Sequence, residues 1–260
     1  MTSPENPRLD TADYFTRLAA TYGSGEYYRK RRKAAVVEIC REIGRVESLL
    51  DLGCGNGTYS AAFRASGLAK VLVGGDLSLG MLREARRRGA ASALLACDAS
   101  VLPFQSGSFE AIFCSHVLQF VADLPRCLDE IARCLKSGGI FIVAGGEFGV
   151  RERLQILVGD ERWAQFAREL PRPRGAGVRR NLVEYKQAAE SAGLAVTHRK
   201  VEFNGSWADL AEFYRVRWLP LLEPFSQASL SATLDAITAE RGSEQISLTE
   251  SLLFCRKPAL

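Results

Sequence analysis

The stretch from Leu49 to Ser60 constrains the fold of this chain more than any other. It reads LLDLGCGNGTYS: an apolar run, then the alternate glycines Gly53, Gly55 and Gly57, then a pattern that favours a helix. Glycine adopts positive φ without steric cost and leaves room for a ligand to approach the backbone. The start of the following helix offers N–H groups that have no intrahelical partner. The pattern therefore predicts a strand, a tight ligand-binding turn and a helix.

Two details of this stretch indicate which class of ligand it binds. The dinucleotide fingerprint G-x-G-x-x-G would require glycine at position 58, where the chain has Thr58. Asp51 stands two residues before the first glycine. A carboxylate there suits a cationic amino group and is a poor neighbour for a pyrophosphate. The stretch therefore favours a ligand with a positive charge over a dinucleotide.

Composition bounds the class of protein. The chain has 260 residues, of which 47% are apolar and 25% are charged, as is usual for a globular protein. A net charge of +4 is too small to indicate a nucleic-acid partner. No apolar run approaches the roughly 18 residues of a membrane helix, and residues 1–10 lack a signal-peptide core. Seven cysteines without a C-x-x-C pair argue against a disulfide framework or a zinc site. We therefore expect a cytoplasmic protein without a membrane association or a bound metal.

The apolar pattern predicts strands that alternate with helices. In the first half, the expected helices are Asp10–Ala20, Glu26–Ile43, Ser78–Gly89 and Asp123–Lys136, and the expected strands after the glycine turn are Lys70–Asp76, Ser92–Cys97, Ser108–Cys114 and Ile140–Ala144. In the second half, the expected helices are 151–170, 181–192, 206–222 and 226–241, and the expected strands are 194–203 and 246–256. Such alternation predicts a parallel sheet with both faces covered.

Further motifs follow the glycine turn in the order of a known family. Asp76 ends the next expected strand, about twenty residues after the turn, and Asp98 and Ala99 follow the strand after that. Leu135–Gly139 reads LKSGG and precedes the fifth strand. Together these motifs resemble those of the class I S-adenosylmethionine-dependent methyltransferases, although Ser137 replaces the proline that is usual in the last of them.

The resemblance implies an α/β fold of Rossmann-like type: a mostly parallel seven-stranded sheet with helices on both faces and an antiparallel last strand. It also implies one domain over residues 1–260. It further implies a mainly helical lid over the carboxyl ends of the strands, because ligands of such sheets bind there. The expected core comprises about 34–146, 181–203 and 246–258. The expected lid comprises about 1–33, 147–180 and 204–245.

The resemblance further implies S-adenosyl-L-methionine as the cofactor. Asp76 would bind the ribose hydroxyls, because a carboxylate only accepts hydrogen bonds. Asp98 would accept a hydrogen bond from the exocyclic amine of adenine, and Leu77 and Met81 would pack on the adenine ring. The expected cofactor-binding residues are Asp51, Gly53, Cys54, Gly55, Asn56, Asp76, Leu77, Met81, Asp98, Ala99, Ser115, Tyr22 and Arg32.

His116 is the candidate general base. Ser115–Leu118 reads SHVL after the fourth strand and is similar to a motif of small-molecule methyltransferases, although Gln119–Phe120 departs from it. A base is required only where the nucleophile keeps its proton at neutral pH. The alternative is a histidine that caps or packs. Two further residues also keep two interpretations: Tyr22 closes over the cofactor or packs, and Arg32 binds the methionine carboxylate or lies on a solvated face.

Motifs that the chain lacks narrow the methyl acceptor. No (D/N)-P-P-Y signature follows the fourth strand and no Pro-Cys dipeptide occurs, which argues against methylation of adenine, glutamine or cytosine. The region after the fourth strand also has no acidic cluster that would indicate a magnesium site. Four arginines lie in a loop without acids, and this loop either attracts an anionic or carrier-bound substrate or is simply solvated. They are Arg172, Arg174, Arg179 and Arg180.

We therefore expect a monomeric or homodimeric enzyme that methylates an O, N or C atom of a small metabolite by in-line displacement. Two alternatives stay open. One is a methyltransferase of tRNA or another nucleic acid, which would need a broad basic face or an RNA-binding module. The other is a non-catalytic protein that binds the cofactor.

Overall fold

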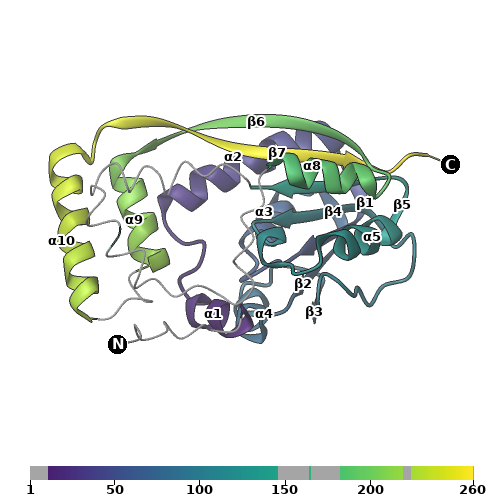
Figure 1. Ribbon diagram of the computed structural model, residues 1–260, viewed down its shortest axis with the longest axis horizontal. Coiled ribbons are helices and arrows are strands. Elements are labelled where there is room, and N and C mark those ends of the chain that lie inside the picture. The colour runs from purple at the N-terminus through teal and green to yellow at the C-terminus, as the bar shows by residue number, and fades with distance from the viewer. Residues whose placement is uncertain (1–10, 146–163, 165–181, 219–223, 260) are drawn as a thin grey trace.

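The computed structural model of the chain describes residues 11–145, 164, 182–218 and 224–259. Within these residues seven strands form one sheet in the order β3-β2-β1-β4-β5-β7-β6 (Figure 1). The strands are β1 (Val46–Leu52), β2 (Ala69–Asp76), β3 (Ala93–Ala96), β4 (Phe109–Ser115), β5 (Leu135–Ala144), β6 (Ala195–Ser206) and β7 (Gln245–Arg256). β7 is antiparallel to both of its neighbours, and the other pairs are parallel. The mostly parallel sheet with an antiparallel last strand is confirmed.

Helices cover both faces of the sheet. On one face, α2 and α3 pack on Leu49, Phe113 and Ile142, and on the other, α5 and α8 pack on Leu50 and Phe141. Adjacent residues of β1 are thus buried in opposite layers, as expected for a strand covered on both faces. The helices are α1 (Thr11–Leu18), α2 (Glu26–Ile43), α3 (Thr58–Ser66), α4 (Leu79–Arg87), α5 (Leu124–Cys134), α8 (Leu182–Ser191), α9 (Trp207–Trp218) and α10 (Pro224–Arg241), and a short 3-10 turn covers Leu118–Phe120.

The last two strands extend well beyond the sheet. β6 and β7 have 12 residues each, against 7 in β1 and in β4. Their pairing continues to Ser206 and Gln245, whereas β5 stops pairing with β7 at Ala144. The protruding part of β6 and β7 carries α9 and α10, drawn in green and yellow (Figure 1). We call this part of the two strands, together with α9 and α10, the overhang.

A separate apolar cluster joins the overhang to the N-terminal part of the chain. Tyr27 and Tyr28 of α2 pack with Tyr214 of α9 and Leu230 of α10. Lys30 adds an ion pair to Asp209, with its Nζ 2.8 Å from the carboxylate. Segments nearly 200 residues apart in sequence therefore pack together in one layer.

The segment Leu135–Ala144 differs from the expected turn followed by a strand at Ile140. Here β5 begins at Leu135, directly after α5. Gly138 has a φ of 72°, and the pairing of β4 with β5 shifts register between Phe109 and Ala111. The LKSGG motif thus forms an irregular start of the strand, because its backbone still finds partners in the sheet.

The helix expected at 151–170, apart from residue 164, and the four arginines of the following loop lie outside the described residues. In the part of the chain that is described, no helix is long and apolar enough to cross a membrane. The same part holds no group of three or more side chains suited to bind a metal ion.

Candidate active site

The three glycines of the turn between β1 and α3 differ in their surroundings. All three have positive φ, which disfavours other residues. A Cβ on Gly53 would lie 2.1 Å from Cγ2 of Val117, and one on Gly57 would lie 2.5 Å from an alanine methyl group. A Cβ on Gly55 would meet only the sulfur of Met81, at 3.8 Å, among the described atoms. Gly53 and Gly57 thus permit close packing, whereas Gly55 leaves open space beside the backbone.

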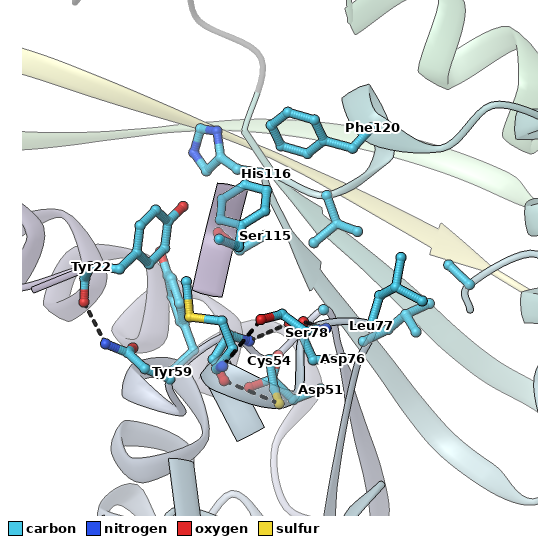
Figure 2. A pocket seen from close by; sticks show the side chains of 18 of the residues that line it. Tyr22, Asp51, Cys54, Tyr59, Asp76, Leu77, Ser78, Ser115, His116 and Phe120 are labelled. Carbon is cyan, nitrogen blue, oxygen red and sulfur yellow. Dashed lines mark hydrogen bonds between the residues drawn. The ribbon is translucent and has the colours of Figure 1, made fainter. Parts of the chain in front are cut away.

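Three carboxylates lie at the carboxyl ends of successive strands. Asp51 is the next-to-last residue of β1, Asp76 is the last residue of β2, and Asp98 follows β3 by two residues. All three line a cavity of about 250 Å³ together with the glycine turn. In Figure 2, Asp51 and Asp76 gather beside Cys54 at one end of this cavity. The structure thus brings together the acids that the sequence placed on three separate strands.

Asp51 is a buried carboxylate without a counter-ion. Its Oδ2 accepts a hydrogen bond from Ser60 Oγ at 2.5 Å, and no cationic side chain pairs with it among the described residues. Burial raises the pKa of Asp51 to about 7, and nearby Asp76 adds to this shift while Ser60 opposes it. A buried carboxyl of this kind suits a ligand that brings its own positive charge.

Asp76 is fixed by backbone hydrogen bonds at both oxygens. The amide of Gly55 donates to Oδ2 and the amide of Ser78 donates to Oδ1, each at 2.8 Å. Burial raises the pKa of Asp76, and these backbone bonds oppose the shift. Each oxygen keeps a further lone pair, so the carboxylate can still accept from a diol.

An apolar surface lies beside the third acid. Asp98 accepts a hydrogen bond from the amide of Ser100 at 2.7 Å, and Ala99 lines the cavity next to it. Leu77 also lines the cavity although 51% of it is exposed, whereas Met81 is 1% exposed. A large apolar side chain exposed at a cavity wall is suited to cover a flat apolar ligand.

The N-terminal segment closes one side of the cavity. The side-chain amide of Asn56 donates to the carbonyls of Ala19, at 3.1 Å, and Tyr22, at 2.6 Å. The rings of Tyr22 and Phe15 are 5.7 Å apart, and those of Phe15 and Phe120 are 5.1 Å apart. The three rings line the cavity. Asn56 also lines the cavity, but its amide holds the N-terminal segment on the glycine turn.

Two adjacent arginines of α2 line the cavity and differ in their partners. Arg32 donates to the carbonyl of Gly23 at 3.5 Å and has no carboxylate partner among the described residues. Burial lowers the pKa of Arg32. Arg31 is buried and faces Glu250, with its Nε 3.7 Å from Oε2. Arg32 is therefore the arginine available to an anionic group of a ligand.

His116 has an uncommon backbone conformation. Its φ of 55° is positive, alone among the non-glycine residues that the structure describes. It follows Ser115, the end of β4, and both residues line the cavity. Figure 2 shows His116 and Phe120 at the end of the cavity away from Asp76. Strained residues of this kind persist where the surrounding structure holds them, often at functional sites.

The side chain of Cys54 packs behind the turn. A Cβ on Gly74 of β2 would lie 3.0 Å from the Cys54 sulfur, and burial raises the pKa of its thiol. Phe15 and Phe120, which line the His116 end of the cavity, and Glu250, which lies behind His116, were not predicted as site residues. The one signal for Glu250 was an acid within the otherwise uncharged run TESLLF.

Comparison with known proteins agrees with this geometry. A family model described as a methyltransferase domain matches residues 50–143. A malonyl-[acyl-carrier protein] O-methyltransferase from Erwinia pyrifoliae is 30% identical over 182 residues, which are 70% of this chain and 65% of the relative. These similarities and the geometry of the site support the resemblance to the class I S-adenosylmethionine-dependent methyltransferases.

A second curated relative and a solved structure are also similar to this chain. A demethylmenaquinone methyltransferase from Clavibacter sepedonicus is 36% identical over 131 residues, which are 49% of this chain and 51% of the relative. The chain thus matches less than two thirds of the length of either curated relative. The solved structure of the YcgJ protein from Bacillus subtilis has a TM-score of 0.59 at 18% identity, over 88% of this chain and 100% of that chain. At this identity the last similarity concerns the fold alone.

Proposed function

We propose that this protein transfers a methyl group from S-adenosyl-L-methionine to an O, N or C atom of a small molecule. One observation carries the proposal: Asp51, Asp76 and Asp98 share a cavity with the open backbone of Gly55. A dinucleotide would set its pyrophosphate against the uncompensated Asp51 carboxylate, whereas an amino-acid ammonium would neutralise it. Both relatives described above are methyltransferases, which supports the same reaction.

Each end of the cavity suits a different part of the cofactor. Asp51 pairs with the ammonium group and Arg32 with the carboxylate of the methionine part. Asp76 accepts from the ribose hydroxyls, because its oxygens keep free lone pairs. Asp98 accepts from the adenine amine, and Leu77 covers the ring. When bound, the cofactor supplies an activated methyl group on a sulfonium, so the protein mainly has to position the reactants.

The acceptor enters at the end of the cavity lined by Phe15, Phe120 and His116. Apolar rings there exclude water, which strengthens electrostatic interactions inside the site. His116 is the candidate base for an acceptor that keeps its proton at neutral pH. The lid in this proposal is the predicted one, about residues 1–33, 147–180 and 204–245, of which residues 1–10, 147–163, 165–180 and 219–223 lie outside the described part of the chain. The described lining includes residues of α1 and α2 but none of α9 or α10.

Calorimetry with S-adenosylhomocysteine tests the cofactor site. We expect micromolar binding by the wild type and binding at least about tenfold weaker in Asp76→Asn, since one charge-assisted contact contributes about 1.5–3 kcal/mol. Asp129→Asn on α5 is the matched control, because Asp129 is exposed and does not line the cavity. Absence of binding by the wild type would contradict the proposal.

A transfer assay then tests the reaction. Methyl-labelled cofactor is incubated with the protein and a metabolite extract, and separately with the two acceptors named by the relatives, malonyl-acyl carrier protein and reduced demethylmenaquinone. Label in a small molecule or in the carrier-bound malonyl group supports the proposal. Label found only in RNase-sensitive material would assign the protein to nucleic-acid methylation, and cofactor binding without transfer to any acceptor would indicate a non-catalytic protein.

A further inference from the structure

A buried array of charged side chains stands behind His116. Nε2 of His116 lies 3.3 Å from Oε1 of Glu250, and Oε2 of the same carboxylate lies 3.7 Å from Nε of Arg31. The side chain of Glu250 is 6% exposed and that of Arg31 is 10% exposed. The rings of Tyr27 and Tyr28 lie beside the guanidinium, with their centres 5.9 Å and 5.3 Å from its Cζ. Three elements thus meet here: α2, the end of β4, and β7 just beyond the end of its pairing with β5.

Three polar atoms of this array lack a hydrogen-bond partner among the described residues. Nε2 of His116, Oε1 of Glu250 and Nε of Arg31 are buried, and none makes a hydrogen bond of good geometry to another described residue. Buried polar atoms are normally satisfied, so such a group needs an explanation. Replacing a buried ion pair with apolar residues of similar size is often neutral or stabilising, which makes stability alone a weak explanation.

We propose that Glu250 is a positioning residue that holds the His116 ring as a base. This inference rests on the proposed methyl transfer. With a small rotation of the ring from the 3.3 Å contact, the carboxylate can accept from Nε2–H, which fixes the ring and leaves Nδ1 as the nitrogen that can take a proton from an acceptor in the cavity. Arg31 keeps Glu250 ionised. The same arrangement stabilises the imidazolium that forms when the proton arrives.

The methyl transfer couples the loss of one proton from the acceptor to the exchange of one bond. The acceptor X–H gives its proton to Nδ1 of His116 while X bonds to the sulfonium methyl group. The carbon–sulfur bond breaks and its electron pair stays on sulfur, which becomes a neutral thioether. His116 becomes an imidazolium and later releases the proton to water. Glu250 stays ionised throughout.

A built base also selects the class of acceptor. A carboxylate is already ionised at neutral pH and needs no base, whereas a phenol, an alcohol or an acidic carbon atom keeps its proton. The array therefore points to an acceptor that carries a hydroxyl or carbon-bound proton at the reacting atom. The apolar walls made by Phe15 and Phe120 suit an aromatic or otherwise apolar body around that atom.

Nuclear magnetic resonance tests the array without any acceptor. The chain has two histidines, so histidine-labelled protein loaded with S-adenosylhomocysteine gives two imidazole systems, and His198→Asn assigns them. We expect a downfield, slowly exchanging Nε2–H of His116 in the wild type. We expect it to move upfield or to be lost by exchange in Glu250→Gln and in Glu250→Gln/Arg31→Met. A His116 proton on Nδ1, or an Nε2–H signal that ignores Glu250→Gln, overturns the proposal.

Kinetics separate positioning from a purely structural role. We expect kcat to fall roughly 10- to 100-fold in Glu250→Gln with little change in KM, a part of the ~10²–10⁴ that a general base supplies. If Glu250 served only to neutralise Arg31, the double variant, which removes both charges, would recover kcat. Persistent loss in a folded double variant supports the proposal, and recovery refutes it. Failure of S-adenosylhomocysteine to bind the wild type would instead refute the proposed function.

Discussion

Asn56 in the glycine turn holds Tyr22 of the N-terminal segment by a hydrogen bond of 2.6 Å from its side-chain amide to the tyrosine carbonyl. A second bond from the same amide reaches Ala19. The ring of Tyr22 lines the cavity. The turn that forms the floor of the cofactor site therefore also fixes the segment that closes one side of it.

Removing this amide should loosen the N-terminal segment. Asn56→Leu leaves two carbonyl groups without their donor, and each bond contributes about 1 kcal/mol. We expect S-adenosylhomocysteine to bind roughly tenfold more weakly, and amides of residues 11–25 to exchange faster in hydrogen-exchange mass spectrometry. Amides of β4 and β5 are the internal control. Unchanged exchange in the N-terminal segment would show that Asn56 does not hold it.

The raised pKa of Asp51 makes cofactor binding depend on pH. With its pKa at about 7, Asp51 is mostly protonated at pH 6 and mostly ionised at pH 8. Only the ionised form attracts an ammonium group, so affinity for S-adenosylhomocysteine should fall about tenfold from pH 8 to pH 6. Calorimetry at both values measures the change.

Two controls accompany this pH dependence. Asp51→Asn should bind more weakly at pH 8 and lose most of the dependence. Methylthioadenosine, which lacks the amino acid, should bind wild type equally at both values. Because burial disfavours the charged carboxylate, Asp51→Asn should also raise the free energy of unfolding of the unliganded protein at pH 8. A pH dependence that persists in Asp51→Asn would assign it to another group.

The substitution Gly53→Ala should disrupt the packing of the turn. The added Cβ would overlap Val117, and overpacking of this kind costs about 1–3 kcal/mol in addition to about 1–2 kcal/mol for the left-handed backbone. Gly107→Ala is the control, since Gly107 has a similar φ of 68° and no described atom within 4 Å of the new Cβ. Urea unfolding of both variants measures the difference. Equal losses would mean that Val117 moves aside freely.

The ion pair behind His116 should support the fold only above acidic pH. Burial alone would raise the pKa of Glu250, but Arg31 and His116 outweigh it and hold this pKa below the ordinary value of 4.5. A carboxyl whose pKa is lower in the folded state stabilises that state above the unfolded pKa, and the contribution is lost as pH falls. Between about pH 5 and pH 3, wild type should therefore lose more unfolding free energy than Glu250→Gln/Arg31→Met. Urea titrations of both proteins at each pH measure this difference. If the ion pair contributes nothing, both proteins will lose the same unfolding free energy.

Local patterns predicted the cofactor end of the fold well. The expected helix Glu26–Ile43 matches α2, and Ser78 caps α4 by accepting from the amide of Met81 at 3.2 Å. Apolar periodicity and capping act over a few residues, so the sequence displays them. The glycine spacing and the acids at strand ends were equally visible, because parallel strands necessarily share one carboxyl edge.

Contacts between distant segments were not predictable in this way. Glu250 faces His116 only because β7 turns back beside β5, and the register of that pairing is set by the whole sheet. Asn56 binds carbonyl groups of a segment 34 or more residues away, and a backbone acceptor has no sequence signature. Phe15 and Phe120 join the site through ring contacts that span more than 100 residues. These residues carry the acceptor end of the proposed site.

Because of the overhang, the residues at the two ends of the cavity are carried by different parts of the fold. Asp51 and Asp76 stand on strands of the parallel core and Asp98 closely follows a third, while Glu250 lies on β7 where β5 no longer flanks it. Insertions or substitutions in the protruding strands and helices can therefore alter the acceptor end and leave the nucleoside end intact. A chain built like this can acquire new acceptors by changing one extension while keeping the same methyl donor.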